Sequence, residues 1–153
     1  MDLILWRHAE AHDAKAGQDD LDRALTAKGE RQSERMAAWL NRVLPESTRV
    51  LASPARRSQQ TVAALDRKFK TLPAIAPGAS VEALLHAARW PDAREPVLVV
   101  GHQPALGLTA AWLLAQSTEP WTVRKGAVLW LRGRDRDGQL QVLLHAAMPP
   151  ELL

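Results

Sequence analysis

The stretch "DLILWRHAEAH" (residues 2–12) places a short apolar run directly before an arginine and a histidine, Arg7 and His8. The run is apolar at consecutive positions, which is typical of a strand buried on both faces of a parallel sheet. The next segment, residues 11–24, is polar, contains a glycine and several aspartates, and is predicted to be a loop. Two basic side chains are therefore expected at the carboxyl end of a buried strand.

Strands and helices alternate through the rest of the chain. A helix is predicted to begin at its N-cap Thr26 and to end before Pro45, because apolar residues recur between them at three- and four-residue spacing. Three further strands are predicted over 48–53, 72–76 and 95–102. Three further helices are predicted from Ser53-Pro54 to about Phe69, over 80–89 and from Pro104. Near the C-terminus, 126–134 and 139–147 are predicted to form a hairpin around Asp137-Gly138. This order predicts an α/β fold: a three-layer α/β/α sandwich with a largely parallel central sheet and an antiparallel C-terminal hairpin.

Composition narrows the classes of protein that fit. With 153 residues, 46% of them hydrophobic, the chain is expected to form a single domain over 1–153. No apolar run approaches the roughly 20 residues of a membrane helix, so no membrane association is expected. The absence of cysteine excludes disulfides and thiolate chemistry and favours a cytoplasmic protein. The net charge of +3 comes from cations interspersed with acids, which does not favour nucleic-acid binding.

Basic residues follow three of the predicted strands. In open α/β sheets, ligands bind beyond the carboxyl ends of the strands, and two of these ends also run into helix N-termini that favour anions. Imidazoles, guanidiniums and helix N-termini together would bind a phosphoryl group. The residues concerned are Arg7 and His8 after the first strand, Ser53, Arg56 and Arg57 after the second, and Gly101 and His102 after the third.

Other site chemistries fit less well. In "HAEAH" (8–12) the glutamate is two residues after the first histidine, unlike a zincin helix, and the chain lacks the cysteine pair of a zinc deaminase. It also contains no P-loop and no dinucleotide-binding glycine fingerprint. No metal site is therefore predicted. His12, His86 and His145 have no comparable context and are interpreted as loop, helix and strand residues.

Four segments resemble the signature motifs of a known family in both order and spacing: "LWRHAEA" (5–11), "LTAKGERQ" (25–32), "SPARRSQQT" (53–61) and "VVGHQP" (99–104). They are similar to those of the histidine phosphatase superfamily, whose fold is phosphoglycerate mutase-like. The short chain and the R-H-A-E-A form resemble the SixA-type phosphohistidine phosphatase branch. The resemblance extends from residue 1 to about residue 115.

The resemblance implies a role for each motif residue. His8 would be the nucleophile that becomes transiently phosphorylated, with Arg7 holding the phosphate beside it. Arg57 corresponds to the phosphate-binding arginine and His102 to the second histidine, while Ser53 is expected to contribute to phosphate binding. No metal or cofactor is implied. Guanidiniums near an imidazole favour its neutral form, as a nucleophile requires.

One departure from the larger family members bears on the substrate. Those members carry an acidic residue, on an insertion before the second histidine, that protonates an alkoxide leaving group. Here the interval 62–100 is short, and Glu82 is the only carboxylate in its middle. A P–N bond needs less help from an acid, and an open site would accept a protein. We therefore expect a monomeric phosphohistidine phosphatase acting on a phosphorelay or phosphotransfer protein.

Two other functions stay open at this stage. One is a general small-molecule phosphatase or mutase that uses Glu82 or Glu10 as its acid. The other is a catalytically silent phosphate-binding module. Turnover of sugar phosphates would favour the first, and phosphate binding without phosphorylation of His8 would favour the second.

Overall fold

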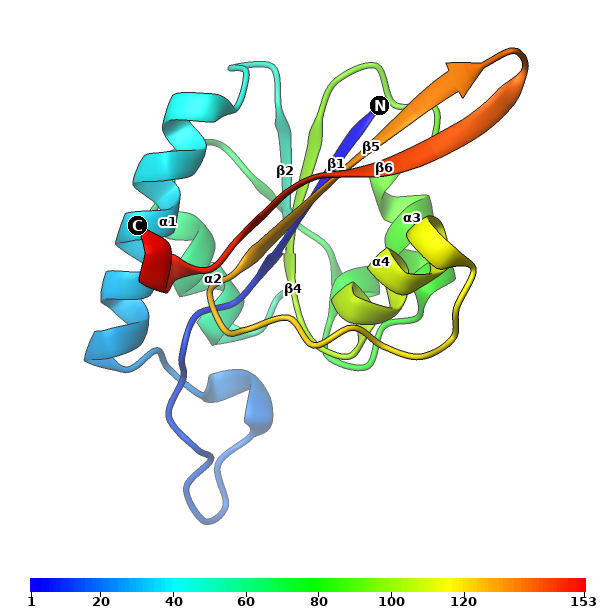
Figure 1. Cartoon of the computed structure of the whole chain (residues 1–153). Helices are drawn as coiled ribbons and strands as arrows, with labels where there is room; N and C mark the ends of the chain where they lie inside the picture. Colours follow the sequence, from blue (N-terminus) through cyan, green and yellow to red (C-terminus); the bar gives the residue numbers. More distant parts are fainter.

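The computed structural model describes all residues, 1–153, and contains one mixed sheet between two layers of helices (Figure 1). The strands lie in the order β3-β2-β4-β1-β5-β6 and comprise β1 Asp2–Arg7, β2 Arg49–Ala52, β3 Lys70–Thr71, β4 Val97–Gly101, β5 Val128–Arg136 and β6 Gln139–Met148. The α-helices are α1 Ala27–Val43, α2 Arg56–Ala63, α3 Val81–Ala88 and α4 Ala105–Ala115. Short 3-10 helices cover Asp20–Asp22, Pro73–Ile75 and Pro150–Leu152. The predicted α/β/α architecture is confirmed.

The strand β1 is buried on both faces, as its unbroken apolar run predicts. Side chains alternate across a strand, so Ile4 and Trp6 lie in one core with α1 and α2, whereas Leu3 and Leu5 lie in a second core with α3 and α4. Figure 1 shows these two helix pairs on opposite faces of the sheet. The unbroken apolar run of β1 therefore matches its position between two layers of helices.

Three parallel strands end side by side. In the pairing of β1 with β4, Arg7 lies opposite Gly101, and the His8 amide donates to the Gly101 carbonyl at 3.1 Å. On the other side of β4, the Ser53 amide donates to the Val100 carbonyl at 3.0 Å. The residues that follow β1, β2 and β4 therefore meet at one edge of the sheet, where the sequence predicted a binding site.

The second signature segment holds the chain just after His8. Thr26 caps α1 by accepting from the Gly29 amide at 3.0 Å, as predicted for an N-cap. At Gly29 a Cβ atom would overlap the carbonyl oxygen of Glu10, so only glycine allows this close approach. The side chain of Gln32 accepts from the Glu10 amide at 3.0 Å. The N-terminal end of α1 thus holds the backbone in place just after β1.

The antiparallel hairpin is also confirmed, and it forms one edge of the sheet. β5 pairs with β1 and then with β6, and the turn residues Asp137 and Gly138 both have positive φ, as their composition predicts. Figure 1 shows the tip of this hairpin extending past the rest of the sheet. The hairpin tip lies away from the edge where the parallel strands end.

Two predicted elements differ from those observed. The helix expected from Ser53 to about Phe69 covers only Arg56–Ala63, because Ser53 accepts from the Ala55 amide in a preceding turn and Asp66 adopts a left-handed conformation just after the helix. The strand expected over 72–76 is a 3-10 helix that begins at Pro73, which has no amide to donate to a sheet. The edge strand is instead formed by Lys70–Thr71.

None of the helices combines the length and the apolar character that crossing a membrane would require.

Candidate active site

A pocket of about 290 Å³ opens at the carboxyl ends of β1 and β4. Its wall is strongly basic and contains no carboxylate. The lining residues are Arg7, His8, Ala11, Arg23, Arg57, Pro77, His102, Gln103 and Lys125. Residues from all three predicted strand ends therefore form one cationic cavity.

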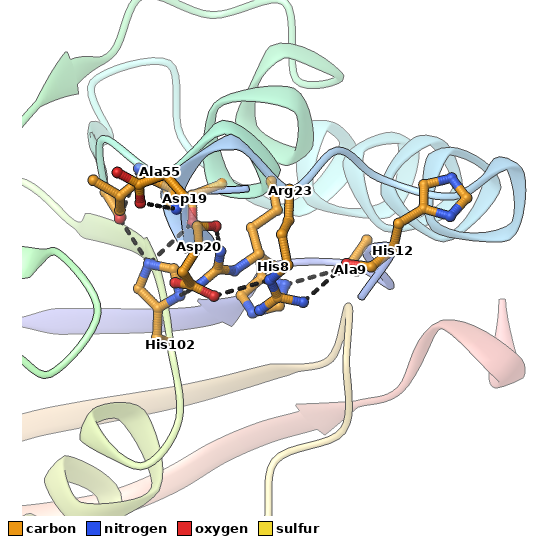
Figure 2. Close-up of polar contacts among 12 residues, drawn as sticks. His8, Ala9, His12, Asp19, Asp20, Arg23, Ala55 and His102 are labelled. Carbon is orange, nitrogen blue, oxygen red and sulfur yellow. Dashed lines mark hydrogen bonds and ion pairs between the residues drawn. The ribbon is translucent and has the colours of Figure 1, made fainter. Parts of the chain in front are cut away.

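The imidazole of His8 is held in a single tautomer. Its Nδ1 lies 2.8 Å from the carbonyl oxygen of Ala9, which can only accept, so Nδ1 carries the hydrogen and Nε2 keeps a lone pair (Figure 2). The backbone around the ring is fixed as well, because the amide of Gly126 donates to the His8 carbonyl at 3.1 Å. His8 thus presents an unprotonated nitrogen from a rigid position.

Burial lowers the pKa of His8 to about 3. The hydrogen bond to Ala9 opposes this shift, while the neighbouring His102, Arg57 and Arg7 reinforce it. The ring is therefore neutral near pH 7, and its Nε2 lone pair is available for attack on an electrophile.

The residue whose carbonyl orients His8, Ala9, is held in turn by helix α2. The Ala9 amide donates to Thr61 Oγ1 at 3.0 Å, and the Thr61 hydroxyl donates to the Arg57 carbonyl at 2.8 Å. Thr61 is fully buried, so these contacts are shielded from water. Hydrogen bonds from α2 therefore hold the amide of Ala9, and the carbonyl of the same residue orients the ring of His8.

The second imidazole, His102, lies with its ring centroid 5.2 Å from that of His8. Its Nδ1 is 3.4 Å from an Arg57 nitrogen that can only donate, so Nδ1 accepts and Nε2 carries the hydrogen. Nε2 then donates to Ser53 Oγ at 2.7 Å. Burial, followed by the charge of Arg57, lowers the pKa of His102 to about 4. Both rings are consequently neutral near pH 7.

Two guanidiniums flank these rings. Arg7 donates from Nη1 to the Val123 carbonyl at 2.7 Å, and burial together with the charge of Arg57 lowers its pKa. The side chain of Arg57 is only 4% exposed. The Nε atoms of Arg7 and Arg57 are buried without any hydrogen-bond partner. Because both arginines line the cavity, their positive charges favour the binding of an anion there.

One carboxylate, Asp20, approaches this cluster from outside the cavity wall. Arg57 donates from Nη2 to Asp20 Oδ2 at 3.0 Å and from Nη1 to the Asp20 carbonyl at 2.8 Å. The other carboxylate oxygen accepts from Arg23 Nε at 2.9 Å (Figure 2). Desolvation opposes the shift, but the hydrogen bonds from Arg57 and Arg23 lower the pKa of Asp20. Asp20 is thus an ionised bridge between two arginines.

The structure brings Arg7, His8, Arg57 and His102 together, and it places two other candidates elsewhere. Ser53 is fully buried behind His102, outside the pocket wall, and its hydroxyl orients that ring. The expectation that Ser53 binds phosphate directly does not match this position. Glu82 is exposed and lines a separate cavity of about 450 Å³ beside Trp112, so it does not reach the pocket.

The sequence analysis missed Asp20, Arg23 and Lys125. Asp20 begins a short 3-10 helix, Arg23 and Lys125 lie in loops, and no local pattern distinguishes the three from other polar residues there. His12, His86 and His145 lie in the predicted loop, helix and strand, with His145 packed against Trp130 at a centroid distance of 5.0 Å. No three His, Cys, Asp or Glu side chains gather in a way that could hold a metal ion.

Comparisons with known proteins agree with this geometry. The family model of the histidine phosphatase superfamily (branch 1) matches residues 3–80. The phosphohistidine phosphatase SixA of Escherichia coli (strain K12) is 33% identical over 129 residues, which cover 78% of each chain. An uncharacterized protein of Picosynechococcus sp. is 33% identical over 142 residues, or 86% of this chain and 85% of that one.

Among solved structures, the protein histidine phosphatase SixA complexed with tungstate matches with a TM-score of 0.78 and 28% identity over 99% of both chains. The fold is therefore the expected phosphoglycerate mutase-like one, and the short form of the chain is shared with SixA. The chain belongs to the histidine phosphatase superfamily, branch 1, and is of its SixA type.

Proposed function

We propose that this chain is a metal-independent phosphatase that hydrolyses phosphohistidine on a phosphorelay or phosphotransfer protein, through a phosphorylated His8 intermediate. The observation that carries the proposal is the neutral His8 ring, whose unpaired Nε2 lies in a cavity lined by guanidiniums and by no carboxylate. Its catalytic residues would be Arg7, His8, Arg57 and His102.

In the first step, His8 Nε2 attacks the phosphorus atom of the substrate. The new N–P bond forms as the bond to the substrate imidazole breaks, and the electron pair of that bond stays on the leaving nitrogen. The leaving ring takes up a proton from water on its other nitrogen, so it departs as neutral imidazole. The guanidiniums of Arg7 and Arg57, which line the cavity, would bind the equatorial oxygens, where negative charge accumulates.

In the second step, water attacks the phosphorus of phospho-His8. The N–P bond breaks, His8 recovers its lone pair, and the proton released by water goes to solvent as inorganic phosphate forms. His102 would lie beside the transferred phosphoryl group during both steps, because Ser53 and Arg57 fix its ring next to His8. Neither step requires a metal ion or a cofactor.

The absence of an acid on the pocket wall favours a P–N bond over a phosphomonoester. An alkoxide leaving group needs a proton donor, but the only carboxylate hydrogen-bonded to pocket residues is Asp20, whose lowered pKa keeps it ionised. Glu82 lies in a different cavity. The name of the E. coli relative, a phosphohistidine phosphatase, supports the same substrate class, and the tungstate complex of the solved relative supports a tetrahedral oxyanion as ligand.

The proposal extends to the working form of the protein. We propose that residues 1–153 act as one domain, as a monomer in the cytoplasm, on a phosphohistidine displayed by a partner protein in signal transduction. The open cavity at the end of the sheet would admit a side chain carried by another protein.

The test is phosphate release from a phosphohistidine-bearing transfer domain and from a small phosphomonoester, measured side by side. We expect release from the protein substrate, capture of labelled phosphate on the enzyme, and loss of both in His8→Ala. The matched control is His86→Ala, which removes an exposed histidine of α3 and should leave both intact.

Three outcomes would contradict the proposal. Undiminished turnover by His8→Ala would exclude the phospho-His8 route. Faster release from the monoester than from the protein would identify a general phosphomonoesterase, and phosphate binding without any turnover would identify a silent binding module.

A further inference from the structure

Two cations of the pocket wall have no role in the proposed mechanism. Arg23 belongs to the loop between β1 and α1, and Lys125 to the loop between α4 and β5. Neither lies in a strand-end motif, and Figure 1 shows both loops at the same edge of the sheet, where β1 and β4 end. The cavity is therefore more basic than a single phosphoryl group requires.

Arg23 is held firmly although it lies in a loop. Its Nε donates to Asp20 Oδ1 at 2.9 Å, and its Nη1 donates to the His12 carbonyl at 3.0 Å. Since Asp20 also accepts from Arg57 at 3.0 Å, one carboxylate fixes Arg23 relative to the phosphate-binding arginine. The Nη2 group of Arg23 makes no hydrogen bond within the chain and is free for a ligand.

Lys125 is placed by its neighbours in the loop. The Val123 carbonyl accepts from Arg7 Nη1 at 2.7 Å, and the Gly126 amide donates to the His8 carbonyl at 3.1 Å. The indole of Trp6 donates to the Gly126 carbonyl at 3.1 Å. Lys125 itself is exposed and forms no ion pair with any carboxylate of the chain. Its ammonium is therefore available at the mouth of the cavity.

The charges around the cavity leave room for one more negative group. Four cations line it and one carboxylate, Asp20, neutralises one of them, while both imidazoles are neutral. The remaining three positive charges exceed the roughly two negative charges of a phosphoryl group. The excess is one charge, which matches a carboxylate and is too small for a second phosphoryl group.

We propose that Arg23 and Lys125 form a second anionic subsite, which binds an aspartate or glutamate side chain next to the phosphohistidine of the partner protein. The proposal rests on the proposed function and deepens it by naming a feature of the substrate. Arg23 binds the carboxylate from one side through its free Nη2, and Lys125 binds it from the opposite loop. Asp20 is the positioning residue for Arg23.

The test uses two peptides that carry one phosphohistidine, made with phosphoramidate, and that differ only in having glutamate or glutamine beside it. The wild-type protein should show kcat/KM about tenfold higher for the glutamate peptide, mainly through KM, and this preference should weaken at high salt. In the double variant Arg23→Gln, Lys125→Gln the preference should fall to about one.

Two further variants separate the subsite from general charge effects. Lys125→Gln alone breaks no ion pair within the chain and should lose part of the preference. The matched control is the double variant Lys68→Gln, Lys70→Gln. It removes two exposed cations at the start of β3 and should keep the full preference.

Equal kcat/KM for the two peptides in the wild-type protein would overturn the subsite and leave the proposed function standing. The same holds if the control variant loses the preference as fully as the double variant. Hydrolysis of neither peptide would instead refute the proposed function, and the subsite with it.

Discussion

The floor of the pocket and its rim are built differently. On the floor, the buried His8 and His102 directly follow β1 and β4, and the buried Arg57 lies in α2, the helix after β2. Their side chains form hydrogen bonds with Ala9, Ser53 and Asp20, and the His8 amide donates to Gly101 of β4. Arg23 and Lys125 on the rim come from loops, and Lys125 is exposed. The sheet therefore fixes the groups that would act on the phosphoryl group, and the loops supply those that would recognise its surroundings.

The largest expected effect comes from removing a cation of the floor. Arg57→Gln should lower kcat for phosphohistidine by about 10² to 10³-fold, because a buried donor aimed at developing charge is lost. Arg56→Gln is the matched control, since Arg56 precedes it on the same helix but is exposed; its kcat should change by less than about twofold. Steady-state kinetics of both variants checks this. An equal loss of kcat in the two variants would contradict the view that the buried Arg57 acts on the phosphoryl group and the exposed Arg56 does not.

The buried histidines predict a pH-dependent stability. Their pKa values, about 3 for His8 and about 4 for His102, lie below the ordinary 6.5. At a pH between the lowered value and 6.5, each of these histidines therefore binds more protons in the unfolded chain than in the folded one. Stability is then complete above about pH 6.5 and falls as the pH falls, by about 1.4 kcal/mol per pH unit for each histidine. Urea denaturation at about pH 6 and about pH 5 measures the slope.

The variant His8→Asn sharpens this measurement. It removes one of the two titrating rings, so its slope between the same pH values should be about half that of the wild type. Identical slopes for the two proteins would mean that His8 titrates normally in the folded state and that its burial does not keep the ring neutral.

A smaller effect on kcat is expected from Thr61, whose hydroxyl holds the residue that orients His8. Thr61→Val removes the hydroxyl that holds the Ala9 amide, and kcat should fall by about tenfold because the nucleophile is less well oriented. Thr61→Ser keeps the hydroxyl and should restore most of the activity. Kinetics are combined with thermal unfolding of both variants. A loss that Thr61→Ser does not restore would point to packing and not to the hydrogen bond.

The smallest effect is expected at Glu82. Glu82→Gln should change turnover of phosphohistidine and of a phosphomonoester by less than about twofold, because the side chain is exposed in a different cavity. Parallel assays with the two substrates provide the comparison. Selective loss of monoester turnover would show that this carboxylate reaches the site after all and serves as its acid.

The fold and the floor of the site could be predicted because their signals are local. Apolar runs identified β1, β2 and β4, and the residue that follows each strand is fixed by the strand itself. Parallel pairing then brings Arg7, His8 and His102 to one edge without any further information.

The rim, and the contacts that support the floor from behind, could not be predicted in this way. The position of Asp20 depends on Arg57, 37 residues further along the chain, and that of Lys125 on a loop anchored to His8. The role of Ser53 depends on its contact with His102, 49 residues away. Such contacts are set by the tertiary structure, so the composition of the loops alone gives no indication of them.

The place of β4 has a consequence for how the protein folds. β4 lies between β1 and β2, so the first two strands to be synthesised do not pair with each other and are joined only through a strand near residue 100. Closing loops of this length is slow, and an incomplete chain exposes unpaired strand edges. The pocket cannot exist in a half-folded chain: its floor is assembled in the same step that completes the centre of the sheet.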